Sequence, residues 1–249
     1  MAVKLTGKSA PTKEARDILL CQIDEALPAL RKKRVSDSRI HDARKQIKAA
    51  RATLRLIRKA LPKAQYRSEN RCLRDAARPL SEARDTAVLL KAFNDLFDGA
   101  PTFTRTDGSV RFGRRLTKDR STSRQAVARR GGLAQTRRLL QGTRSRAAHW
   151  HISGKGWSVL GAGLKQVFSR ARQALEAARA TPSDTALHEW RKQTKYLRHQ
   201  LMLLRPIHPH RIDALADDLH QLSDYLGDDH DLAVLRGKLE LNSHLFEND

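Results

Sequence analysis

The amino-acid sequence predicts an all-α protein built from two pseudo-symmetric helical bundles. Apolar residues recur at helical spacing through almost the whole chain, and no segment shows the apolar–polar alternation of a half-buried strand. Two motifs also occur twice at nearly equal separations, which indicates a duplicated unit. Because apolar residues make up 39% of the 249 residues and aromatic residues only 5%, the core must consist mostly of Leu, Ala, Val and Ile.

The first half, residues 12–148, is predicted to contain four helices followed by a long basic helix. Ser36-Asp37-Ser38 offers N-cap side chains for the second helix, and Pro62 closes it. Residues 99–113, with scattered Gly, Pro and Thr, are expected to form a loop, and Gly131-Gly132 to kink the helix that follows. The predicted helices cover residues 12–34, 38–61, 65–79, 81–97 and 114–148.

The second half, residues 154–249, is expected to form the second bundle within one domain that spans residues 1–249. Prolines separate its helices, and Thr181–Asp184 is typical of a helix start. The predicted helices cover residues 157–180, 184–205, 210–227 and 229–246.

The charge of the chain predicts a polyanionic partner. Lys and Arg number 49 against 27 Asp and Glu, a formal net charge of +22, and such a field attracts nucleic acid, acidic membrane or polyphosphate. The charge is unevenly spread, because residues 206–249 carry ten acidic and only three basic side chains. Aromatic residues are too few for a row of base-stacking platforms.

Cysteine usage and the N-terminus favour a reduced, cytoplasmic protein. Cys21 and Cys72 form neither a C-x-x-C redox motif nor a cysteine zinc site. The first ten residues lack the apolar core of a signal peptide, and no apolar run approaches the length of a membrane span. We therefore expect no membrane association.

The internal repeat is most evident in one basic helix of each half. His41–Lys48 recurs as His188–Lys195, and the shared pattern H-x-x-R-K-Q-x-K-x-x-R is offset by 147 residues. A second pair, Arg84–Leu89 and His230–Leu235, is offset by 146 residues. Two motifs repeated in the same order predict that each half contains the same helical unit.

On a helical wheel, each copy of the first motif combines an apolar face with a basic stripe along its edge. A solvated charged face without a ligand is the alternative interpretation. Such a face usually carries acidic residues that pair with the basic ones, but no acidic residue interrupts the first stripe from Arg44 to Arg58. Arginines in the predicted long basic helix add further candidates, because Arg makes multidentate contacts with phosphate. The candidate binding residues are His41, Arg44, Lys45, Lys48, Arg51, Arg55, Arg130, Arg137, Arg138, His188, Arg191, Lys192, Lys195 and Arg198.

The paired motif helices, each followed by an R/H-D-x-x-V-L segment, resemble the CHAD family, the conserved-histidine α-helical domain. The run Leu226–Leu235 is close to that family's second-half signature, and the resemblance covers most of residues 12–246. It implies two helical bundles around a central basic groove that binds long inorganic polyphosphate without turning it over. It also implies association with polyphosphate granules in the cytoplasm.

Metal binding, catalysis and nucleic-acid binding fit the sequence less well than polyphosphate binding. The motif histidines lie among cations, which repel a metal ion, and Asp228–Asp231 with His220 matches no metal-binding spacing. Asp85 and Asp231 are instead expected to cap a helix or pair with a basic residue. The sequence shows no nucleotide-binding fingerprint, so we expect no catalytic residue, metal or cofactor. Weak, sequence-nonspecific RNA or DNA binding remains the alternative, followed by recruitment of acidic proteins, and the sequence identifies no protein partner.

Overall fold

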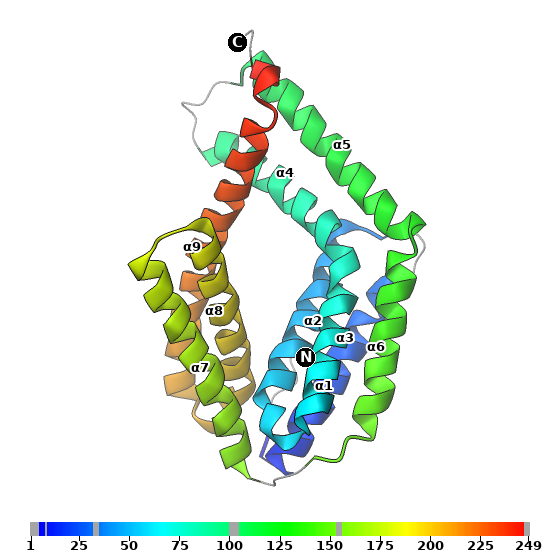
Figure 1. Ribbon diagram of the computed structural model, residues 1–249, viewed down its shortest axis with the longest axis vertical. Coiled ribbons are helices and arrows are strands. Elements are labelled where there is room, and N and C mark those ends of the chain that lie inside the picture. Colours follow the sequence, from blue (N-terminus) through cyan, green and yellow to red (C-terminus); the bar gives the residue numbers. More distant parts are fainter. Residues whose placement is uncertain (1–4, 8, 32–34, 100–104, 153–155, 247–249) are drawn as a thin grey trace.

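A computed structural model describes residues 5–7, 9–31, 35–99, 105–152 and 156–246, and helices form nearly all of this part of the chain (Figure 1). No strand occurs in the described residues, so the predicted all-α class is confirmed. The helices are α1 (Pro11–Ala26), α2 (Asp37–Leu56), α3 (Lys63–Ala77), α4 (Ser81–Gly99), α5 (Asp107–Arg129), α6 (Gly132–Ala148), α7 (Trp157–Ala180), α8 (Asp184–Leu204) and α9 (Pro209–Glu240).

Hydroxyl side chains cap three of these helices. The Ser36 Oγ accepts a hydrogen bond from the backbone N–H of Arg39, in α2, at 3.4 Å. The Ser183 Oγ accepts one from the backbone N–H of Ala186, in α8, at 3.2 Å. Ser36 is one of the three candidate caps that the sequence offered, and Ser183 lies in the segment predicted as a helix start. Thr106 caps α5 in the same way, at 3.3 Å, and the helix therefore begins inside the segment predicted as a loop over 99–113. Residues 100–104 of that segment lie outside the described residues.

Prolines and glycines account for two differences from the predicted helix ends. The helix expected over 12–34 ends at Ala26 and continues as a 3-10 turn, Pro28–Leu30, because Pro28 has no N–H to continue the α-helical ladder. The long basic helix expected over 114–148 is two helices, since Gly131 adopts φ 69°, a left-handed conformation that ends α5 and starts α6. The predicted kink is a complete break.

The second half differs from the prediction at its end. The helices expected over 210–227 and 229–246 form one continuous helix, α9, followed by a 3-10 turn at Ser243–Phe246. In the first half, Pro79 lies in a 3-10 segment that separates α3 from α4. The second half has Gly227 near the matching point, and a glycine inside a helix costs stability without breaking the backbone ladder.

The helices form two bundles that meet at a shared upper end. α1, α2, α3 and α6 pack together on one side, and α7, α8 and the beginning of α9 on the other (Figure 1). α4, α5 and the end of α9 pack against one another above them. A third apolar cluster, separate from those of the bundles, holds this upper part together; its buried members are Leu89, Leu90, Phe93, Phe112, Leu116 and Leu235.

α2 connects the two bundles. It packs against α1 and α3 in its own bundle and against α7 and α8 in the other. Ala52 of α2 belongs to an apolar cluster with Tyr196 and Leu197 of α8, so this core crosses the predicted division between the halves. A Cβ on Gly163 of α7 would lie 2.0 Å from the Leu56 carbonyl oxygen, so this close approach requires glycine. The described helices include none with the length and hydropathy to span a membrane.

Candidate functional site

The two motif helices, α2 and α8, lie in direct contact. The guanidinium carbon of Arg55 lies 4.1 Å from the centroid of the Tyr196 ring, and that of Arg51 lies 6.0 Å from it. The Gln200 amide donates a hydrogen bond to the Ala52 carbonyl oxygen at 3.0 Å. These contacts join the basic stripes of the two halves along one seam.

Lys48 and Lys195 hold the same position in the two motif copies, and the structure brings them together. Desolvation lowers the pKa of Lys48 to about 8, with help from the positive charges of Arg44, Lys195 and Arg191. Desolvation also lowers the pKa of Lys195 to about 8, and Arg191 adds to that shift. Cations from both halves therefore act on one another.

Several of these cations have no carboxylate partner. In the described ranges, no ion pair involves Lys48, Lys195 or Arg198. The Nε atoms of Arg191 and Arg198 are buried and lack a hydrogen-bond acceptor. Buried donors without acceptors are costly, and an anion with several oxygens would satisfy them.

The arginines of the first stripe are held in place by protein groups. The Arg44 Nη1 donates to the Ala77 carbonyl oxygen at 3.2 Å and to the Ser81 Oγ at 2.5 Å. The Asn70 Oδ1 accepts from the Arg51 Nε at 3.4 Å and from the Arg55 Nη1 at 3.0 Å. Each guanidinium keeps further N–H groups, so these arginines are oriented in advance and retain donors for a ligand.

The acidic residue of the second repeated motif lies beside the arginine of the first. The Asp231 Oδ1 is 3.9 Å from the Arg191 Nη1, so the expected pairing of Asp231 with a basic residue is present. In the other half, burial lowers the pKa of Arg44, and the negative charge of Asp85 opposes that shift. An aspartate of the second motif therefore acts on the arginine of the first in both halves, as an ion pair at Arg191 and through its charge at Arg44.

The motif histidines are partly buried among positively charged or imidazole groups, and this lowers the pKa of both. Desolvation lowers the pKa of His41, with a contribution from Arg84, and desolvation lowers the pKa of His188, with one from His230. The rings of His188 and His230 have centroids 4.4 Å apart. Within the described residues, no group of three or more His, Cys, Asp or Glu side chains is placed to hold a metal ion. Their lowered pKa values disfavour the charged form in the free protein.

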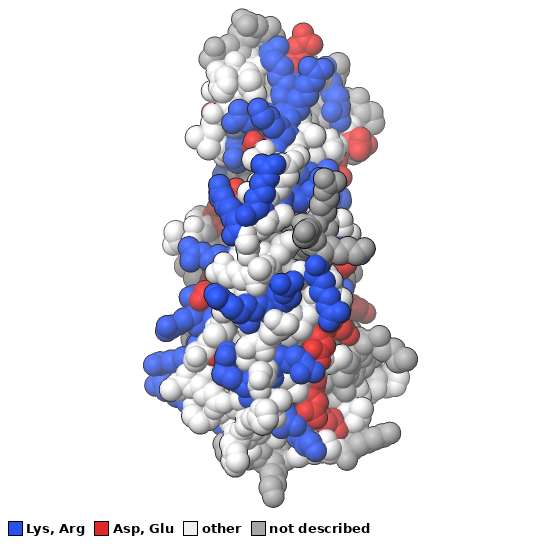
Figure 2. Space-filling model, turned by 90° about the vertical axis from the view of Figure 1, so that its right-hand side faces the viewer, with Lys and Arg blue, Asp and Glu red and all other residues white. Residues whose placement is uncertain are grey.

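The remaining candidates are less closely integrated. Lys45 is exposed on α2, and Lys192 pairs with Glu189 on its own helix. Arg130, Arg137 and Arg138 follow the end of α5 and the length of α6, which packs against α1, α3 and α5. α6 lies at the edge of the molecule opposite α7–α9 (Figure 1), and the face shown in Figure 2 is rich in Lys and Arg.

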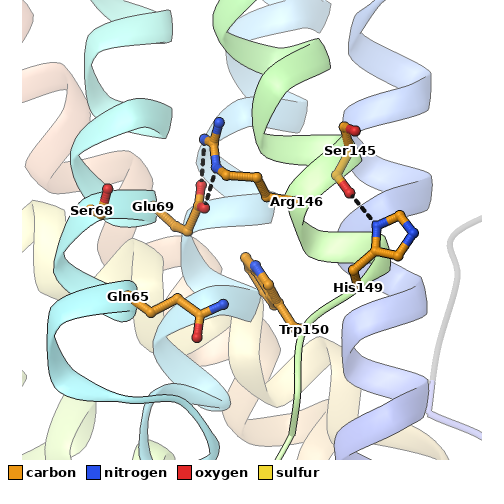
Figure 3. Close-up of a pocket in the computed structure, with 7 residues that line it drawn as sticks. All are labelled: Gln65, Ser68, Glu69, Ser145, Arg146, His149 and Trp150. Atoms are coloured by element: carbon orange, nitrogen blue, oxygen red, sulfur yellow. Dashed lines mark hydrogen bonds and ion pairs between the residues drawn. The ribbon is translucent and has the colours of Figure 1, made fainter.

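A separate cavity lies between α3 and α6 (Figure 3). Its volume is about 540 Å³, and the buried Glu69 carboxylate within it accepts hydrogen bonds from Arg146 at 2.6 and 2.9 Å. Because these two charges neutralise each other, the cavity adds little to the attraction for an anion. Its lining is Gln65, Ser68, Glu69, Ser145, Arg146, His149 and Trp150.

Sequence reasoning missed four residues of the α2–α8 seam: Asn70, Arg84, Tyr196 and His199. The pKa of His199 falls to about 4, first through desolvation and then through the charges of Arg198 and Lys48. Arg84 belongs to the second repeated motif, so its position close to His41 of the first motif could have been expected. Asn70 and Tyr196 gave no signal, because only the packed helices bring them to the arginines.

Comparison with known proteins agrees with this fold. The family model of the CHAD domain matches residues 16–240. No curated protein gave a significant match. The crystal structure of the CHAD domain from the plant Ricinus communis is similar, with a TM-score of 0.74 at 19% sequence identity over 99% of this chain and 84% of that one. At that identity the likeness shows a shared fold, and the family match covers most of the sequence. The chain therefore belongs to the CHAD domain family.

Proposed function

We propose that the protein binds inorganic polyphosphate, without chemically altering it, along the seam between α2 and α8. The observation that carries this proposal is the gathering of cations from both halves around Lys48, whose pKa is lowered to about 8 first by desolvation and then by the positive charges of Arg44, Lys195 and Arg191. Like charges held together repel, and a polyanion placed between them replaces repulsion with attraction.

The donor set favours a chain of phosphates over a single anion. Charged groups from two helices extend along the seam, from His41 to Arg55 on α2 and from His188 to Arg198 on α8. A linear polyanion that contacts several of them gains from each contact after the first as an intramolecular event. Orthophosphate makes one such contact, so we expect its affinity to be far weaker.

The environment of Lys48 supports a groove. The side chain remains accessible to water, yet desolvation is the first cause of its lowered pKa. Both statements hold for a group that protein surrounds on several sides while one side stays open. We infer that the open side is the central basic groove expected of this family.

We also propose where in the cell the protein acts. We place the protein in the cytoplasm, at the granules in which polyphosphate accumulates. Nucleic acid is the rival ligand, and the Lys and Arg side chains spread over the face shown in Figure 2 favour it, because a duplex backbone needs a broad basic surface. The scarcity of aromatic residues disfavours single-stranded bases.

Competition between ligands tests the proposal. Long polyphosphate and mixed-sequence RNA, at equal phosphate concentration, would displace a labelled polyphosphate from the protein in a fluorescence anisotropy assay. We expect polyphosphate to compete at least tenfold better, with micromolar or tighter affinity. Equal competition by RNA would contradict a polyphosphate-specific seam.

Matched variants locate the site. Replacing Lys48 and Lys195 by Gln is expected to weaken polyphosphate binding at least tenfold, by removing the two unpaired central cations. Replacing Arg172 and Arg179, exposed on α7, by Gln removes the same charge elsewhere and should change affinity less than twofold.

A third variant tests the basic residues of α6. Neutralising Arg130, Arg137 and Arg138 should weaken binding less than the double exchange on α2 and α8, although it removes one charge more. If it weakens binding more, the site lies on the side shown in Figure 2, and the seam is not the binding surface.

A further inference from the structure

The second bundle leaves open a face that α6 covers in the first. There α6 lies across α1 and α3, with Arg144 bonded to Asp24 of α1 and Arg146 bonded to Glu69 of α3. In the second bundle α7 and α9 take the places of α1 and α3, and each packs against α8 (Figure 1). Apart from α8, no helix in the described part of the chain packs against both.

On α9, the positions that α6 covers in the first bundle are exposed to water. Leu215 stands at the position of Glu69, 146 residues earlier, which is the offset of the second repeated motif. Leu222 corresponds in the same way to Ala76, whose carbonyl oxygen accepts a hydrogen bond from Thr136 of α6 at 2.9 Å. Glu69 is only 2% exposed and Ala76 is fully buried. Leu215 is 48% exposed, and Leu222 is partly exposed.

α7 shows the same change. Its buried stripe repeats that of α1 148 residues further on, in the pairs Thr12 and Leu160, Ala15 and Gly163, Leu19 and Val167, Ile23 and Ala171, and Ala26 and Ala174. At this offset Phe168 stands at the position of Leu20, which packs against the core of the first bundle, yet Phe168 is 54% exposed. Exposed apolar side chains gathered on one face of a soluble protein indicate a partner.

The two helices that border this open face carry opposite charges. α7 has four basic side chains and one acidic, whereas residues 212–235 of α9 include seven aspartates and no Lys or Arg. Asp213, Asp224 and Asp231 act on cations of their own bundle. The other four aspartates and the four basic side chains are exposed, and none of them takes part in an ion pair within the described ranges; they are Asp217, Asp218, Asp228, Asp229, Lys165, Arg170, Arg172 and Arg179.

We propose that two copies of this chain associate through the open face, with α7 of each copy lying on α9 of the other. α7 and α9 run in the same direction, because each is antiparallel to α8 (Figure 1). A two-fold axis parallel to these helices therefore brings a basic helix onto an acidic one twice, so the face is self-complementary. Other surfaces of a chain with a net charge of +22 are mostly basic and repel a second copy.

The face is large enough for a stable dimer. Twenty residues of helix are about 30 Å long and two helices are about 20 Å wide, which gives about 600 Å² in projection. The corrugated accessible surface is larger than its projection, and stable complexes cover about 800 Å² on each partner. Asp224, which acts on Lys195 of the seam, is turned by about 120° around α9 from Asp218, so both seams stay open in the dimer.

The mass of the unmodified full chain in solution tests the proposal. Bound polyanions would be removed first by washing at high salt, and the mass then measured by sedimentation equilibrium over a range of concentrations. We expect the mass to rise from 28.1 kDa toward twice that value. A mass of 28.1 kDa even at about 100 µM would overturn the proposal, because interfaces of this area bind with micromolar or tighter affinity.

Two charge-reversed variants test the pairing of α7 with α9. The first carries Glu in place of three cations of α7, namely Lys165, Arg172 and Arg179. The second carries Lys in place of three aspartates of α9, namely Asp217, Asp218 and Asp229. Each variant alone should be monomeric, since its two helices carry like charges. An equimolar mixture should form a heterodimer, because each reversed helix then meets one of opposite charge.

A matched control carries Glu in place of Lys63, Arg67 and Lys118, which are exposed on α3 and α5, and should remain a dimer. A mixture of the two reversed variants that stays monomeric would overturn the two-fold arrangement, and so would a dimer of either variant alone. If the unmodified chain is monomeric but binds a peptide with the sequence of α6, Gly132–Ala148, the face takes a helix from another protein, and the dimer is wrong. No polyphosphate is added, so these outcomes do not depend on the proposed function.

Discussion

Raising the pH from 7 to 9 should weaken polyphosphate binding, because Lys48 and Lys195 lose their protons in the free protein over this range. Their pKa values of about 8 lie well below the ordinary 10.5. A bound polyanion stabilises the charged amines and raises both pKa values, so binding takes up protons. The contribution of the two lysines to affinity is therefore complete below pH 8 and lost as the pH rises through 8 toward the pKa of the complex.

The size of the effect follows from the two shifts. If binding returns both pKa values to the ordinary value, each lysine costs about tenfold in affinity between pH 7 and 9, or about 100-fold together. This is an upper limit, because Lys48 is open to water, which screens its neighbours. At pH 9 the complex should take up nearly two protons by the same arithmetic.

Calorimetry in buffers with different ionisation enthalpies measures this proton uptake directly. Replacing both lysines by Arg keeps their charge without titration in this range, so the variant should bind nearly equally at pH 7 and 9. Arg at Lys63 and Lys118 serves as the matched control and should preserve the pH dependence. Flat affinity and no proton uptake in the unmodified protein would refute the reasoning.

Unfolding would not explain such a loss of affinity. The native state has lower lysine pKa values than the unfolded chain, so it binds fewer protons between pH 8 and 10.5. Stability rises with pH wherever the unfolded state binds more protons, so the cost of these two lysines to folding diminishes over the range in which binding weakens.

Two further predictions concern the seam and the contact that builds it. Neutralising Lys195 and Arg198 should reduce the slope of log affinity against log salt by about 1.4, at roughly 0.7 for each phosphate contact; an unchanged slope would remove the second half from the site. Gly163→Ala should lower stability by about 1–3 kcal/mol in thermal unfolding, because its Cβ would meet a backbone oxygen of α2 at 2.0 Å. Gly161→Ala, in the same helix with open space around it, should instead stabilise by up to about 1 kcal/mol, and equal melting of the two variants would contradict the close approach.

The sequence predicted most helices because periodicity and capping are local properties. Ser36, one of three candidate caps, and Ser183, within a predicted helix start, cap α2 and α8. The errors fall where a local signal has two outcomes that only packing decides. Gly131-Gly132 could kink a helix or end it, and Gly132 packs with its Cα hydrogen toward Pro79, where a Cβ would lie 3.1 Å from the proline ring. Gly227 could equally end a helix, but α9 continues through it.

The candidate site was predictable in its residues and not in their roles. The repeated motif identified the stripes, because two copies of one pattern expose positions that a single copy does not distinguish. It could not separate Arg44, which hydrogen bonds to Ala77 and Ser81, from Lys48, which pairs with no acid in the described part of the chain. That distinction depends on neighbours from other helices, which come together only in the folded chain.

The repeat also explains why cations of both halves come together around Lys48. When two copies of one helix face each other, equivalent residues meet, and a basic stripe therefore meets a basic stripe. The apolar contacts of Ala52 with Tyr196, Leu197 and their neighbours hold α2 against α8 despite that repulsion. Since the repulsion exists only while the seam is empty, its relief contributes to ligand affinity and not to folding. A carboxylate in place of Lys48 would be attracted by the positive charges of Lys195 and Arg191, so stability and polyanion affinity favour opposite charges at this position.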